Sequence, residues 1–162
     1  VVEFIKKYKN FNLIPHSPKD YSFPEKGSRW AVTKDRFREY VKFNQYVSFI
    51  QQIYLKHDMS VAMRGHGQLN AIAVNMPSLY FSTQDKVRDF SLKNGFGNYN
   101  IDIKEKEWQQ KLNHCMNRML NDESYLKQWY EIRNEKMLEF RQQFAECVSE
   151  MTEIISNENC RK

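Results

Sequence analysis

The chain has 162 residues, of which 41% are hydrophobic and 28% are charged. This length and composition are typical of one globular domain with a hydrophobic core, and they exclude a disordered chain. No apolar run approaches the roughly 18–20 residues of a membrane span, and the first residues lack the pattern of a secretory signal. The net charge of +5 suits an anionic ligand, a lipid headgroup surface or nucleic acid. Because acidic and basic residues are interspersed instead of clustered, we expect no nucleic-acid partner.

The first third of the chain alternates helical and extended patterns. Apolar residues recur on one face of a short helix in Val1–Lys9, and the apolar run Phe11–His16 predicts a buried strand followed by a loop. From Thr33 to Lys56 apolar residues recur at intervals of three and four, which predicts one helix or two.

Two further strands and a helix follow. The apolar run Met59–Met63 is too short for a helix and predicts a strand, and Ser78–Ser82 predicts another. Between them, Gly67–Asn75 predicts a helix whose small alanines suit close packing on a sheet. Asn75 can take the left-handed position at its end, and Pro77 cannot continue the helix.

The rest of the chain is predicted to be mostly helical. A helix over 83–95 ends at Gly95, with Val87, Phe90 and Leu92 facing inward, and a short strand follows at Tyr99–Ile103. Two apolar stripes at helical spacing then predict a helical tail over 104–158, and we expect them to form core or domain-contact surface. The stripes are Trp108, Leu112, Cys115, Met116 and Met119, then Leu126, Trp129, Tyr130, Arg133, Met137, Phe140, Phe144, Val148, Met151 and Ile155.

Alternating strands and helices at this spacing predict crossover connections and a parallel sheet. The fold class is therefore α/β, with residues 1–162 forming one domain that includes the helical tail. The three cysteines, Cys115, Cys147 and Cys160, are scattered and lack metal-ligand spacing, which favours buried or free thiols in a reducing compartment. No metal-hydrolase or serine-hydrolase motif is present, so we expect no metal.

Polar residues follow three of the predicted strands. In an open parallel sheet, ligands bind beyond the carboxyl ends of the strands. The candidate binding residues at this edge are His16, then Arg64, Gly65, His66 and Gly67, then Ser82, Thr83 and Lys86.

Among these candidates, the segment "RGHGQ" has the clearest physical reasons to bind an anion. Its glycines allow close backbone approach, and the helix that begins near Gly67 offers unpaired N–H groups. Arg64 can bind a carboxylate or phosphate through two parallel hydrogen bonds, with His66 close to the same anion. The alternative is a turn that carries an incidental basic pair, because an isolated Arg-x-His is common.

The stretch from His57 to Phe90 resembles the C-terminal portion of the polysaccharide pyruvyl transferase family. That family has an Asp before an apolar strand, then Met-Arg-x-His, a small-residue helix, a Pro, a strand and a Lys-Val before an aromatic residue. The matching residues are Asp58, Met63, Arg64, His66, Ala71, Ala73, Pro77, Lys86, Val87 and Phe90. Two positions differ: Gly65 stands where the family usually has Leu, and Ser82-Thr83 where a Tyr is frequent.

The resemblance implies a Rossmann-like lobe of a GT-B-type architecture, namely the C-terminal, donor-binding lobe, with an N-terminal acceptor lobe preceding residue 1. It implies transfer of pyruvyl from phosphoenolpyruvate to hydroxyls of a saccharide or lipid-linked saccharide in surface-polysaccharide synthesis. Arg64 and His66 would be the catalytic pair, with Lys86 and His16 binding the donor. Such an enzyme needs no further cofactor and is expected in the cytoplasm, peripherally associated with the inner face of the membrane.

Two alternatives stay open at this point. The first is a GT-B glycosyltransferase that uses a nucleotide-sugar. Such a donor usually requires a carboxylate near the sheet edge, for which Asp85 and Asp102 are available. The second is a non-catalytic module that binds an anion or a sugar, or a partner-binding helical domain.

Overall fold

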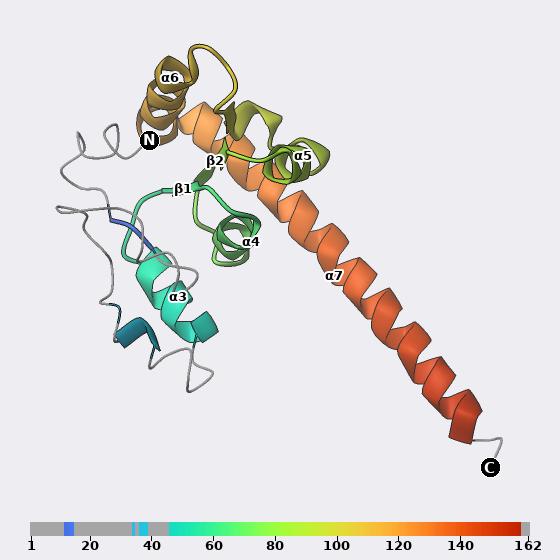
Figure 1. The fold of residues 1–162 in the computed structure, drawn as a ribbon. Helices are drawn as coiled ribbons and strands as arrows, with labels where there is room; N and C mark the ends of the chain where they lie inside the picture. Colours follow the sequence, from blue (N-terminus) through green and yellow to red (C-terminus); the bar gives the residue numbers. More distant parts are fainter. Residues whose placement is uncertain (1–11, 15–33, 35, 39–45, 160–162) are drawn as a thin grey trace.

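The computed structural model describes residues 12–14, 34, 36–38 and 46–159 of the chain. The predicted helix at Val1–Lys9 and residue His16 lie outside this range. Of the predicted strand Phe11–His16, residues 12–14 are described, and Leu13 forms a single β-bridge. Figure 1 shows the arrangement of the elements. In chain order these are α3 (Tyr46–Tyr54), β1 (Ser60–Ala62), α4 (Gly65–Ala73), β2 (Ser78–Ser82), α5 (Asp85–Lys93), the 3-10 turn η2 (Gly97–Tyr99), β3 (Asn100–Asp102), α6 (Trp108–Asn121) and α7 (Glu123–Asn159).

The described strands form one parallel sheet in the order β1-β2-β3. Ser60 pairs with Ser78 across the first two strands, and Tyr80 pairs with Asn100 across the next two. All five residues of the central strand β2 are buried, as expected for a parallel strand covered on both faces. The predicted α/β class is therefore confirmed: helices flank a parallel sheet, and a long helix forms the C-terminal extension.

The helices α4 and α5 end in the same way. Asn75 has φ 59°, and the Met76 N–H donates to the Ala71 carbonyl at 2.9 Å. Gly95 has φ 82°, and the Phe96 N–H donates to the Ser91 carbonyl at 2.8 Å. Both are helix ends closed by a left-handed residue, as predicted for Asn75. The start of α4 was predicted at Gly67, and this is wrong, because the helix begins two residues earlier at Gly65.

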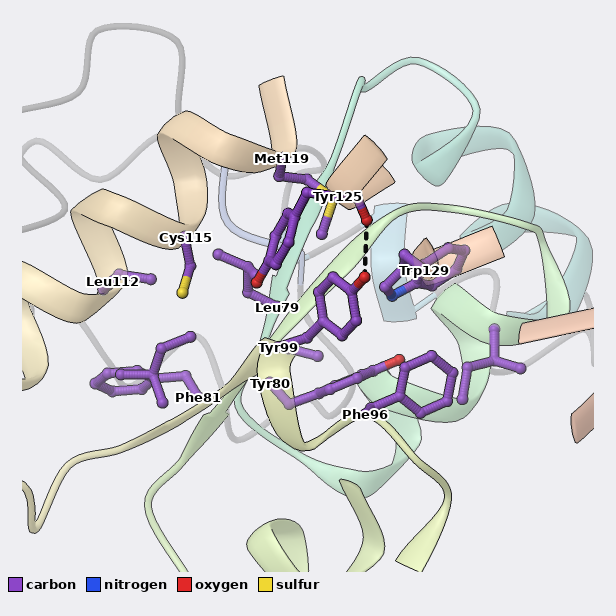
Figure 2. Close-up of a cluster of buried hydrophobic side chains, with 13 residues drawn as sticks. Leu79, Tyr80, Phe81, Phe96, Tyr99, Leu112, Cys115, Met119, Tyr125 and Trp129 are labelled. Atoms are coloured by element: carbon purple, nitrogen blue, oxygen red, sulfur yellow. Dashed lines mark hydrogen bonds between the residues drawn. The ribbon is translucent and has the colours of Figure 1, made fainter. Parts of the chain in front are cut away.

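Aromatic side chains dominate the core between the sheet and the last two helices (Figure 2). The Tyr99 hydroxyl donates to the Tyr125 carbonyl at 2.7 Å, and the Tyr125 hydroxyl donates to the Asn98 carbonyl at the same distance. Burial raises the pKa of Tyr99 to about 12, so its hydroxyl remains a donor at neutral pH. Trp129 of α7 is fully buried beside Phe96, with ring centroids 5.8 Å apart.

The two predicted stripes of the tail differ in what covers them. In α6, Leu112, Cys115 and Met119 are buried in the core as predicted. In α7 the stripe is covered only in its first part, because every residue over 141–156 is exposed. The predicted inward position of Leu92 is wrong, since 52% of this residue is exposed. No helix among the described residues is long and apolar enough to cross a membrane.

Candidate functional site

Two helices begin at the carboxyl edge of the sheet. β1 leads through Met63 and Arg64 into α4, and β2 leads through Thr83 and Gln84 into α5. Because β1 and β2 are adjacent and parallel, both helix N-termini lie at the same edge, and α4 contacts α5. The N-cap residues Arg64 and Gln84 have extended backbones, and neither side chain makes a capping hydrogen bond. Two positive helix ends therefore meet this edge.

The predicted cations lie at these two helix ends. Arg64 is the exposed N-cap residue of α4, and His66 is exposed in the first turn of that helix. Lys86 is exposed in the first turn of α5, and Thr83 is exposed just before it. The fold thus brings Arg64, His66 and Lys86 to one edge of the sheet, in contact with solvent. A guanidinium, an imidazole and an ammonium at paired helix N-termini can bind a compact anion.

The two glycines of "RGHGQ" have different surroundings. Gly65 is half-buried, and a Cβ added there would meet no heavy atom of the described residues within 4 Å. A side chain with a Cβ at position 65 is therefore compatible with this geometry. Gly67 is buried, and its carbonyl accepts a 3.4 Å hydrogen bond from the Tyr54 hydroxyl of α3.

Ser82 lies inside the protein although it ends a strand. It is 2% exposed, and its hydroxyl donates to Asn100 Oδ1. The Ser91 hydroxyl of α5 donates to the same oxygen at 3.0 Å. The hydroxyl of Ser82 therefore takes part in a hydrogen-bond cluster that joins β2, β3 and α5 beneath the edge.

Gln68 is a residue of this region that the sequence analysis did not single out. It is fully buried, and its Nε2 donates to the Val87 carbonyl in the first turn of α5 at 3.3 Å. Its Oε1 has no hydrogen-bond partner in the described part of the chain. Gln68 thus ties together the two helix starts that carry the cations. Its spacing of three and four residues from Ala71 and Ile72 was an unused signal that would have indicated an inward position.

An ion-pair network occupies the β3 side of the same edge. Lys104 Nζ lies 2.7 Å from Asp85 Oδ1, and Arg88 Nη1 lies 3.3 Å from that oxygen and 3.5 Å from Asp102 Oδ2. The hydrogen bond and charge of Lys104, with a smaller contribution from Arg88, lower the pKa of the Asp85 carboxyl. Asp85 and Asp102, the two candidate carboxylates for a nucleotide-sugar donor, therefore already have cationic partners.

Within the described residues, no group of three or more His, Cys, Asp or Glu side chains is arranged to hold a metal ion. His16 lies outside the described residues, and the geometry of the sheet edge given above does not include it. Comparison of the chain with protein-family models, with curated proteins and with solved structures gives no match. The functional assignment therefore depends on the sequence pattern and on the geometry of the sheet edge.

Proposed function

We propose that this chain is the donor-binding lobe of a pyruvyltransferase-like enzyme and that its sheet edge binds phosphoenolpyruvate. The observation that carries the proposal is the shared position of Arg64, His66 and Lys86 at two adjacent helix N-termini. The same three residues belong to the pattern that resembles the polysaccharide pyruvyl transferase family. The parallel sheet is consistent with a Rossmann-like lobe of a GT-B-type architecture, in which a second lobe supplies the acceptor saccharide.

The chemistry of phosphoenolpyruvate matches these groups. Its carboxylate suits the two-pronged guanidinium of Arg64, and its phosphate suits Lys86 together with the helix N–H groups. In ketal formation, two acceptor hydroxyls bond to C2 of the donor and the bond from C2 to the phosphate oxygen breaks. The two acceptor hydroxyls lose two protons. One is balanced by the proton that C3 gains, and the other leaves with the phosphate. His66 is the residue proposed to supply a proton to C3 or to stabilise the departing phosphate.

Calorimetric titration of the protein with phosphoenolpyruvate tests the proposal. We expect saturable binding and a rise in melting temperature with ligand concentration. Arg64→Ala should abolish both effects at the same ligand concentrations, because it removes a bidentate, charge-assisted contact. Lys86→Ala should weaken binding about tenfold or more, the range of a lost hydrogen bond between charged groups.

Two matched variants test whether binding depends on the guanidinium group at position 64 and on the location of the cation at the sheet edge. Arg64→Lys keeps the cation but loses the planar fork, so binding should be intermediate between wild type and Arg64→Ala. Lys93→Ala removes an exposed cation from the last turn of α5, far from the edge, and should leave binding unchanged. Undiminished binding by Arg64→Ala would reject the site, and tighter binding of a nucleotide-sugar than of phosphoenolpyruvate would reject the donor.

A further inference from the structure

The second half of α7 extends far beyond the rest of the molecule (Figure 1). Every residue over 141–156 is exposed, although this segment carries large apolar side chains. Phe144 is 71% exposed, and Met151, Ile154 and Ile155 are each close to 60% exposed. A helix that leaves so much apolar surface in water requires a partner for that surface.

The apolar side chains of the extension share one face. Phe144, Val148, Met151 and Ile155 follow one another at intervals of four, three and four residues, which places them within about 60° of arc on the helix. Cys147 and Ile154 lie beside this row and widen the face. We call these six residues the α7 apolar face. Glu139, Glu146 and Glu153 lie on the opposite side of the helix, and Glu150 lies at the border of the face, about 40° from Ile154.

The α7 apolar face continues a face that is covered in the first half of the helix. On that half, Trp129 is fully buried in the core, and Arg133 Nε donates to the Ile72 carbonyl of α4 at 2.8 Å. Met137 packs against the same core. The covered face and the exposed face are thus one stripe, and the body of the protein covers only its beginning.

We propose that the occupant of the α7 apolar face is the same face of a second copy of this chain, with the two helices antiparallel. A parallel pair would place the partner's residues 123–137 along the same residues of this copy. That position is already filled by α4 and the core. An antiparallel pair joins the two extensions and leaves the two bodies at opposite ends.

Charge along the extension favours the same orientation. The only cation over 141–156 is Arg141 at its beginning, and the later charges are Glu146, Glu150 and Glu153. Antiparallel pairing brings the cationic start of each helix toward the acidic end of its partner, whereas parallel pairing aligns the glutamates with one another. An acidic polar side also disfavours an anionic lipid surface, because helices that lie on membranes carry Lys and Arg there.

The antiparallel arrangement has a register that matches the apolar residues. With Phe144 opposite Ile155 of the partner, Val148 lies opposite Met151, and the reciprocal pairs follow from the two-fold symmetry. Four apolar pairs of this kind then form a continuous contact between the extensions.

Light scattering during size-exclusion chromatography tests the pairing on the full chain. We expect twice the chain mass of 19.6 kDa for the wild type at micromolar concentrations and above. Val148→Glu with Met151→Glu should give the mass of one chain, because both glutamates would be buried in the pair. The control, Gln142→Glu with Ser149→Glu, adds the same charge on the opposite side and should remain dimeric. Near-ultraviolet circular dichroism from the buried Trp129 verifies that the body of each variant is folded.

Cysteine cross-linking tests the orientation in a background with Cys147→Ser and Cys160→Ser. Phe144→Cys mixed with Ile155→Cys should form a disulfide-linked dimer, whereas Phe144→Cys alone should not. Self-cross-linking of Phe144→Cys would overturn the antiparallel arrangement. A wild-type chain that stays monomeric would overturn the pairing, and so would a dimer that survives Val148→Glu with Met151→Glu. Binding of the wild type, but not of that double variant, to anionic vesicles would identify a lipid surface as the occupant instead.

Discussion

At the scale of single residues, two glycines near helix ends differ in what they require. Gly65 has no left-handed backbone, and a Cβ there would meet no atom within 4 Å in the part of the chain that the structure describes. Gly95 has φ 82°, and a Cβ there would lie 3.3 Å from Ile132 Cγ2 of α7. The same substitution to alanine should therefore have opposite effects at the two positions.

We expect Gly65→Ala to stabilise the protein by about 0.4–1 kcal/mol, because alanine restricts the unfolded chain without strain in the folded one. Gly95→Ala should destabilise it by about 1–2 kcal/mol, the cost of a left-handed conformation for a residue with a Cβ. Thermal unfolding followed by circular dichroism measures both. A lower melting temperature for Gly65→Ala would show that this glycine is needed for the backbone and not merely tolerated.

Asp122 makes the start of α7 sensitive to acid. Its carboxylate accepts hydrogen bonds from the Ser124 hydroxyl and the Tyr125 N–H, and Arg118 donates to its second oxygen. These contacts lower its pKa from 3.8 to about 2. Since the folded pKa is depressed, the carboxylate stabilises the fold fully above about pH 4, and this contribution is lost as the pH falls toward about 2.

Asp122→Asn keeps an oxygen at the helix cap but removes the negative charge. We expect its melting temperature to lie below that of the wild type at pH 6. The difference should shrink as the pH is lowered from about 4 to about 2, where the wild-type carboxyl also becomes neutral. A difference that stays constant over this range would mean that the charge of Asp122 does not stabilise the helix.

For the candidate site, the sequence predicted which residues follow the strands and at which edge of the sheet they lie. It did not predict which of these side chains are buried. Arg64, His66 and Lys86 were predicted because polar residues that follow buried strands gather at one edge of a parallel sheet. Ser82 was grouped with them, yet β2 is buried on both faces, and its last residue is buried with it. Gln68 was missed because a polar side chain within a small-residue helix gives no indication of a ligand.

At the scale of elements, the Arg133 side chain joins α7 to the end of α4. Arg133 donates to the carbonyls of Ile72 and Ala73, the last residues of α4, at 2.8 and 3.4 Å. A cation at the C-terminus of a helix opposes the negative end of its dipole. The Arg133 guanidinium adds a charged donor to the Ile72 carbonyl, which also accepts from the Asn75 N–H at 3.3 Å. Burial, with a further contribution from Arg141, lowers the pKa of this guanidinium, which remains charged at neutral pH.

Arg133→Met removes these contacts while keeping most of the side-chain volume. We expect a loss of about 1–3 kcal/mol in the free energy of unfolding, the range for hydrogen bonds to a charged group. Lys127→Met is the control on the same helix, because Lys127 is exposed and its ion pair with Glu131 spans 3.9 Å. Denaturant unfolding should distinguish the two variants, and equal losses would mean that Arg133 does not join α7 to α4.

The elements themselves were predictable to different degrees. The strands β1, β2 and β3 were predicted because short apolar runs lie between turn residues. The start of α4 was placed too late because glycine and histidine are weak helix formers, so propensity argued against Gly65 and His66. For α7, periodicity predicted an apolar stripe but could not distinguish burial by the same chain from exposure, because both give the same pattern.

At the scale of the whole molecule, the described residues form an α/β body and a helical extension whose residues over 141–156 are all exposed. The extension begins at Arg141, where exposure becomes continuous, and the hydrogen bond of Arg133 to α4 lies before that point. The candidate anion site belongs to the body, at the edge where α4 and α5 begin. Loss of the extension should therefore affect assembly and leave both the fold and ligand binding intact.

A chain truncated after Phe140 tests this separation. The proper reference is the monomeric variant Val148→Glu with Met151→Glu, since dimerisation of the wild type would itself raise the melting temperature by mass action. We expect the truncated chain to melt within a few degrees of that variant, because a change below about 1 kcal/mol moves the melting temperature of a chain of this size by about 2–4 °C or less. Its titration with phosphoenolpyruvate should match that of the full chain. A truncated chain that fails to fold would mean that the extension stabilises the body directly, and binding lost without loss of fold would mean that the extension contributes to the site.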